Sequence, residues 1–147
     1  MYKRQSYTMP EDWNEVTEEV LATNPGGAID TVAVWGEAFD GSRSNVIVEA
    51  GSAGGESDPE AIRATWESNM AAATGATPVE MEGTTIAEEE AIGAVLESTN
   101  DEGIEVEQFV YLVIHDEDVY SIGLSAEAGD DESRELFEQM LASWSWQ

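Results

Sequence analysis

The sequence predicts an α+β domain in which an antiparallel sheet of about six to eight strands is sandwiched between helices. Predicted strands follow one another as hairpins, so most of them should pair with neighbours along the chain. One strand, 104–114, is apolar on both faces, which is typical of a strand covered from above and below. The 147 residues show no repeat and no composition break, so we expect 1–147 to form a single domain.

The first half of the chain predicts four strands and a connection. An alternating segment that is interrupted at Pro10 predicts two short strands, the second of which carries Trp13. A strand at 29–36 and a strand at 45–49 flank a DGSRS turn and should form a hairpin. The glycine-rich segment 51–57 then predicts a flexible connection.

Two helices are predicted from their caps and their apolar periodicity. The first should begin at Asp58-Pro59, an N-cap followed by proline, and end near Gly75. Its apolar face consists of Ile62, Trp66, Met70 and Ala73. The second should begin near Asp130 and Asp131. Its apolar face consists of Leu136, Phe137, Met140, Leu141 and Trp144.

Between the helices the sequence predicts a meander. Strands at 79–86 and 91–98 should be joined by an acidic turn, and NDEG at 100–103 should turn the chain into the strand 104–114. The strand after HDED alternates cleanly. One face of this strand carries Tyr120, Ile122, Leu124 and Ala126. The opposite face carries Ser121, Gly123 and Ser125, whose small side chains would let a helix approach closely.

The charge is strongly unbalanced, with 32 acids, 5 bases and a formal net charge of −27. The acids are spread along the whole chain, which indicates an acidic coat on a folded domain. One interpretation is adaptation to high salt, where screening reduces the repulsion between carboxylates; the other is an ordinary acidic protein. Either surface repels phosphates, so we expect no nucleic-acid partner.

The composition also disfavours several other classes of protein. Without cysteine there are no disulfides, thiolate chemistry or Cys-ligated metal centres. No apolar run approaches the ~18 residues of a membrane span, so we expect no direct membrane insertion. The start of the chain has no apolar segment typical of a signal peptide, which favours a cytoplasmic protein as the chain stands.

The only histidine, His115, precedes Asp116, Glu117 and Asp118, which raises the question of a metal or catalytic site. Histidine can bind metal or shuttle protons, but no second histidine is present. A calcium loop fails because Tyr120 stands where a ligand is required. We therefore expect HDED to be the bend of a hairpin and not a site.

Other motifs also lack the residues that chemistry requires. No Gly-x-Ser-x-Gly elbow accompanies the histidine, and the glycine-rich 51–55 lacks the Lys-Ser/Thr of a phosphate loop. The EEE run at 88–90 could supply paired carboxylates for glycoside hydrolysis, but a solvated turn is the simpler interpretation. We expect no catalytic residues, no metal ligands and no cofactor.

The tryptophans divide into two groups. Trp66 and Trp144 lie on apolar helix faces and are expected in the core. Trp13, Trp35 and Trp146 are left open, since an exposed tryptophan would mark a binding patch.

The order of motifs resembles that of the PsbP-like domains. The resemblance begins with YTMPEDWNEV, where an aromatic strand leads into Pro-x-x-Trp, and continues with GSRSNVIVE, which includes Asn45. The first long helix of that family resembles DPEAIRATWESNM. Its long hairpin resembles EQFVYLVIHDEDVYSIGLSAEA, which includes Gln108, and its closing helix resembles FEQMLASWSW, with Trp144 where Phe is commoner.

The resemblance covers nearly the whole chain and is nearest to the bacterial LpqN-type lipoprotein branch. It implies an α-β-α sandwich and a module without enzymatic activity, because members of the superfamily share no catalytic residues. The lipobox of such lipoproteins is absent, so the alternative location is the extracytoplasmic domain of a lipoprotein whose leader has been removed.

These observations lead to three hypotheses. The first is a non-catalytic protein-binding or accessory module whose protein partner is unknown. The second is a domain that binds a small molecule or cation in a sheet–helix cleft or a carboxylate cluster. The third, an enzyme that uses carboxylates alone, is the least favoured.

Overall fold

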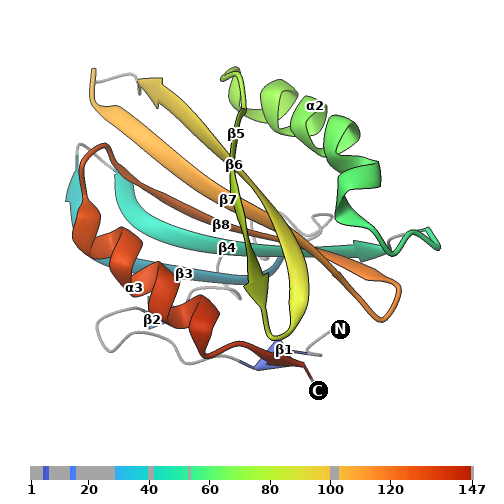
Figure 1. Cartoon of the computed structure of the whole chain (residues 1–147). Coiled ribbons are helices and arrows are strands. Elements are labelled where there is room, and N and C mark those ends of the chain that lie inside the picture. Colours follow the sequence, from blue (N-terminus) through green and yellow to red (C-terminus); the bar gives the residue numbers. More distant parts are fainter. Residues whose placement is uncertain are drawn as a thin grey trace.

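The structure is a computed structural model that describes residues 5–6, 14–15, 29–39, 42–52, 54–99 and 103–146 (Figure 1). The strands are β1 Gln5–Ser6, β2 Asn14–Glu15, β3 Ile29–Phe39, β4 Ser42–Ser52, β5 Val79–Ile86, β6 Glu89–Thr99, β7 Glu105–His115, β8 Asp118–Glu127 and β9 Ser145–Trp146. The helical elements are η1 Pro59–Ile62, α2 Arg63–Thr74 and α3 Asp131–Ala142.

The strands form an antiparallel sheet in the order β2-β3-β4-β8-β7-β6-β5, and β1 pairs separately with β9. Five of these strands, from β4 to β5 in that order, carry the described core. Strands β5 to β8 pair with their neighbours in sequence, whereas β4 pairs with the distant β8. The predicted α+β class and antiparallel sheet are confirmed.

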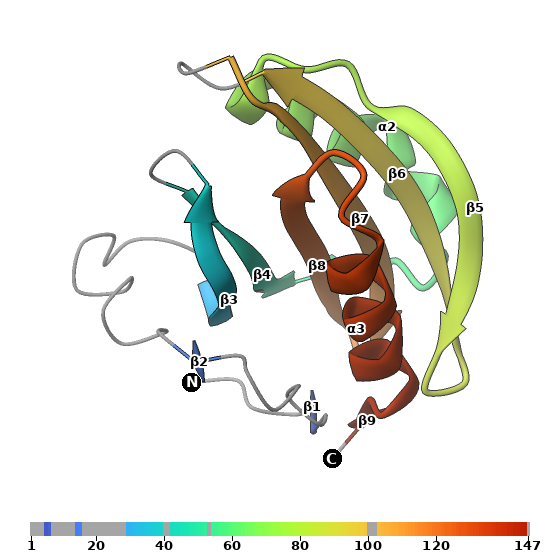
Figure 2. The same ribbon diagram turned by 90° about the vertical axis from the view of Figure 1, so that its left-hand side faces the viewer.

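The two α-helices pack on opposite faces of the central strands (Figures 1 and 2). Helix α3 and the residue after its C-cap place Phe137, Met140, Leu141 and Trp144 against one face. Trp66 of α2 packs on the other face with Ile92, Ala94 and Leu112. Strand β7 supplies side chains to both clusters, which is why its sequence is apolar throughout.

Burial follows the predicted pattern in β7 and β8. The buried residues of β7 include Phe109, Tyr111, Leu112, Val113 and Ile114, and Val110 is half-buried. The predicted inward face of β8 is buried, and consists of Tyr120, Ile122, Leu124 and Ala126. The alternation in sequence therefore identified which face of β8 meets the core.

The first helix differs from its prediction. Asp58 does cap it, accepting a hydrogen bond from the backbone N–H of Glu60, and Gly75 ends it with a φ of 74°. However, 59–62 forms a 3-10 turn, and the α-helix begins only at Arg63. Ile62 has a φ of −111° and a ψ of 6°, which interrupts a regular helix between the two elements.

Three predicted boundaries in the sheet were wrong. The DGSRS segment is not all turn, because β3 runs to Phe39 and β4 already begins at Ser42. The glycine-rich connection is shorter than predicted, because β4 extends to Ser52 by pairing with β8 as far as Asp118. The turn after β5 consists of Ala87 and Glu88, so Glu89 and Glu90 belong to β6. The short strands near the N-terminus are β1 and β2, and Trp13 lies outside the described residues.

Candidate functional site

His115 is the last residue of β7 and precedes a tight turn. Asp116 and Glu117 both have positive φ values, 48° and 69°, so HDED contains the predicted hairpin bend. The imidazole is half-buried and stacks on Trp146 with a centroid distance of 4.2 Å. Its nitrogens lie 3.7 Å from a carboxylate oxygen of Glu89 and 3.3 Å from one of Asp116.

The three glutamates of the EEE run at 88–90 have different surroundings in the structure. In the EEE run, Glu88 lies in the turn, Glu89 approaches His115, and Glu90 is exposed on β6. Within the described ranges, no three His, Asp or Glu side chains lie close enough together to hold a metal ion.

The tryptophans that are described pack inside the domain or against its aromatic residues. Trp66 and Trp144 are buried, as predicted. Trp146 packs between His115 and Tyr120, with Trp144 at its edge, so the described surroundings of Trp146 are a packing cluster and not a binding patch. Trp35 lies within β3.

A cleft of about 290 Å³ lies between α2 and the sheet and is the candidate functional site. Its apolar lining includes Ile47, Trp66, Met70, Leu96 and Val110. Its polar lining includes Glu49, Asn69, Thr74, Gln108, Ser121 and Ser125. A concave site that combines an apolar wall with a few polar groups has the make-up of a ligand site.

The small residues of β8 explain why this space exists. Trp66 reaches the sheet at Ser121, where its indole N–H donates to the hydroxyl at 3.3 Å. Farther along the same face, Gly123 and Ser125 line the cleft. Small side chains at these positions leave room between helix and sheet. The same small residues predicted a close approach of the helix, which occurs at Ser121, whereas the opening beside that contact was not predicted from them.

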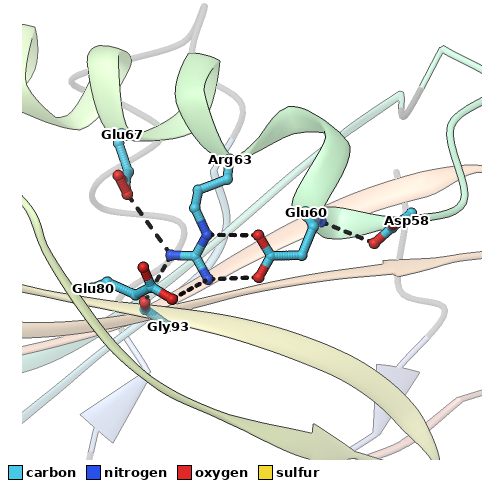
Figure 3. A network of polar contacts seen from close by, with 6 residues as sticks. All are labelled: Asp58, Glu60, Arg63, Glu67, Glu80 and Gly93. Carbon is cyan, nitrogen blue, oxygen red and sulfur yellow. Dashed lines mark hydrogen bonds and ion pairs between the residues drawn. The ribbon is translucent and has the colours of Figure 1, made fainter.

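Arg63 fixes the first turn of the helix (Figure 3). Its guanidinium binds both carboxylate oxygens of Glu60 at 2.9 Å. It also donates to the backbone carbonyl of Gly93 at 3.3 Å and lies 3.7 Å from Glu67 and 3.8 Å from Glu80. One arginine therefore ties η1 and α2 to β5 and β6, while Trp66 ties α2 to β8.

The Arg63 pair also shifts the pKa values of its two members. The hydrogen bond from Arg63 lowers the pKa of Glu60, and the same bond raises the pKa of Arg63. Both shifts favour the charged forms, so the pair is ionised at neutral pH. This keeps the helix anchored on a surface that otherwise carries a large excess of acids.

A second exposed feature is β5, which forms one edge of the sheet. Val79 is a large apolar residue that is 60% exposed, and the residues that follow it along the strand are largely polar. Glu80, Glu82 and Glu90 line an open pocket beside this edge. Gly83 lies where the register between β5 and β6 shifts, and the close approach there requires glycine, because a Cβ would lie 2.5 Å from the carbonyl oxygen of Ala91.

The described helices include none that is long and apolar enough to cross a membrane. No protein-family model matches the chain, and no curated protein matches it.

Solved structures do share its fold. The solution structure of cyanobacterial PsbP (CyanoP) from Synechocystis has a TM-score of 0.69 at 11% identity, with 98% of this chain and 87% of that one covered. A Bacteroides thetaiotaomicron crystal structure has a TM-score of 0.61 at 14% identity, and 98% of this chain matches 45% of that protein's length. PA94 from Pseudomonas aeruginosa, a protein of unknown function, has a TM-score of 0.56 at 10% identity, with 92% and 94% covered. The chain therefore has a PsbP-like fold.

Proposed function

We propose that the chain is a non-catalytic protein-binding or accessory module, built on a complete α-β-α sandwich and related to the LpqN-type lipoprotein branch. The observation that carries the proposal is the exposed edge strand β5. Its eight residues end the sheet, and six of them are exposed. An exposed edge offers backbone donors and acceptors to an extended segment of a partner.

Charge indicates the chemistry of that partner. Glu80 and Glu82 lie on β5, and the chain as a whole carries −27. Opposite charge steers association and suppresses wrong partners. A basic extended segment of another protein, with an apolar residue to cover Val79, is the partner that suits this edge.

The experiment is affinity capture from the native extract at the salt concentration of the source, followed by hydrogen exchange on the recovered complex. We expect a partner whose binding protects the amides of β5. Glu82→Lys should weaken capture several-fold, whereas Glu132→Lys, the same charge change on exposed α3, should not. Recovery of no partner, together with turnover in a broad hydrolase screen, would contradict the proposal.

A second candidate function is the binding of a small molecule or cation, and the cleft under α2 favours it. Its volume of about 290 Å³ and its mixed lining suit a small ligand. For a cation, calorimetric titration with calcium and magnesium is the test. Saturable binding that persists in molar chloride supports a site, whereas uptake that disappears with salt is counterion attraction.

A further inference from the structure

We propose that the cleft under α2 binds a small uncharged molecule in which a flat apolar body carries a group that both donates and accepts hydrogen bonds, such as a primary amide. The inference rests on the second candidate function, small-molecule binding, and specifies the ligand class.

The apolar body follows from one wall of the cleft. Trp66 and Met70 line it from the helix, and Ile47 and Val110 line it from the sheet. Aromatic and thioether side chains favour contact with a flat ring. The volume of about 290 Å³ is at the small end of ligand sites, so the occupant should be about the size of one substituted ring.

The polar group follows from the pairing across the floor. Ser121 lies opposite Glu49 in β4, and Ser125 lies opposite Gln108 in β7. The two serine hydroxyls sit on one face of β8, because they are four residues apart. The floor therefore presents hydroxyl, carboxylate and amide groups side by side.

The hydrogen bonds within the floor determine which donors and acceptors remain for a ligand. The hydroxyl of Ser121 accepts from the indole of Trp66 at 3.3 Å, and that of Ser125 accepts from the side-chain amide of Gln108 at 3.0 Å. Each hydroxyl keeps its own hydrogen to donate. The carboxylate of Glu49 and the amide oxygen of Gln108 can accept. A group with both a donor and an acceptor, such as an amide, can accept from a serine hydroxyl and donate to Glu49 or Gln108 at the same time.

Neither charged class of ligand suits the cleft. A carboxylate ligand has no hydrogen to donate to Glu49 or to the amide oxygen of Gln108, so it would leave these acceptors of the lining without a donor. A cation would gain little from Glu49, which is exposed and screened by water. Its desolvation against Trp66 and Met70 would oppose binding.

The test uses three probes of one shape that differ in charge: benzamide, benzamidinium and benzoate. Each is titrated into ¹⁵N-labelled protein in molar potassium chloride, which screens non-specific attraction. We expect saturable shifts with benzamide at the Trp66 indole N–H and at the amides of 121–125. Benzoate should produce no shift, and benzamidinium should bind at least about tenfold more weakly, a difference of about 1.4 kcal/mol.

A matched pair of variants locates the site. Ser125→Val removes a floor hydroxyl and fills space, and should weaken benzamide binding about tenfold or more. Ser98→Val makes the same change on β6, outside the cleft lining, and should leave it within about twofold. Equal weakening in both variants would overturn the assignment.

The remaining outcomes separate the inference from the function on which it rests. Tighter binding of benzamidinium or benzoate at the same amides would overturn the uncharged class and keep the cleft as a ligand site. No saturable shift with any of the three probes would overturn the inference and the small-molecule candidate together. Neither result bears on the protein-binding proposal, which the β5 variants test.

Discussion

The two faces of the sheet are built from the same strands and are filled very differently. Among the described residues, the α3 face holds a continuous cluster of fifteen buried apolar residues, whereas the α2 face holds four. Helix α3 packs on aromatic and aliphatic side chains of the sheet. Helix α2 contacts the sheet through Trp66 and Arg63 and leaves a cleft beside them. We therefore expect the α3 face to provide most of the stability, whereas the α2 face has room for a ligand.

The largest effect is expected when a large side chain is removed from the α3 face. Phe137 is 1% exposed, and its ring lies 6.3 Å from that of Tyr111. Phe137→Ala should lower the free energy of unfolding by about 3–5 kcal/mol, because it loses the buried ring and leaves a cavity into which the surroundings relax only partially. Urea denaturation followed by circular dichroism measures the loss. A loss below about 2 kcal/mol would show that this face is not the main source of stability.

The matching change on the α2 face is Leu112→Ala. Leu112 is 3% exposed and packs with Trp66, Ile92 and Ala94. The expected loss is about 2–5 kcal/mol, toward the lower end, because the smaller cluster can relax into the space. The same urea titration gives the value. If Leu112→Ala costs more than Phe137→Ala, the ranking of the two faces is reversed.

Salt should act on both faces equally, because the charge lies on the surface. At low ionic strength the acids repel over about 30 Å, which opposes the compact state. We expect the melting temperature to rise by several degrees between millimolar and molar chloride. This corresponds to a gain of about 1 kcal/mol or more in the free energy of unfolding. The rise should be the same in the wild type, Phe137→Ala and Leu112→Ala. A melting temperature that does not change with chloride would remove the case for a salt-adapted surface.

The contact between Trp66 and Ser121 can be tested alone. Trp66→Phe keeps an aromatic ring but removes the indole N–H that donates to the hydroxyl, and should cost about 0.5–1.5 kcal/mol beyond the loss of ring volume. A double-mutant cycle with Ser121→Ala isolates the hydrogen bond. Strict additivity of the two single changes would mean that this contact does not hold the helix.

The smallest expected effect is the pH dependence of the Arg63 anchor. The hydrogen bond from Arg63 lowers the pKa of Glu60 below its ordinary value of 4.5. Its stabilisation is therefore present above that value and is lost as the pH falls through the lowered pKa. The melting temperature of Glu60→Gln should lie below that of the wild type at neutral pH and converge with it in acid. Glu97→Gln, which removes one exposed charge from β6, should show no such convergence.

Local patterns predicted much of this fold. The apolar run of β7 and the alternation of β8 identified the centre of the sheet, since side-chain orientation in a strand follows from sequence alone. The cap at Asp58 and the stop at Gly75 were also visible. A turn between β5 and β6 was predicted, but its two residues, Ala87 and Glu88, were not, because both adopt positive φ without the glycine or asparagine that normally signals such a turn.

A sheet–helix cleft was one hypothesis from the sequence, but the residues that line it could not be predicted, because they come from distant parts of the chain. Ser121 meets Trp66 across 55 residues, and Glu49 enters the floor only because β4 pairs with β8. The sequence showed the small residues of β8 and the apolar face of the helix. Where the helix would cross the sheet follows from packing that no local pattern encodes.

The pairing of β4 with β8 also has a consequence for the order of folding. Strands β5 to β8 close short loops, whereas joining Ser52 to Asp118 closes a long one at a higher entropic cost. The meander should therefore form first, and the β3–β4 hairpin should dock onto it late. Val48→Ala, in β4, should then mainly speed unfolding, whereas Val113→Ala, in β7, should mainly slow folding, as stopped-flow chevrons would show. Until β4 docks, β8 is an open edge, so the nascent chain would be most prone to aggregate in that interval.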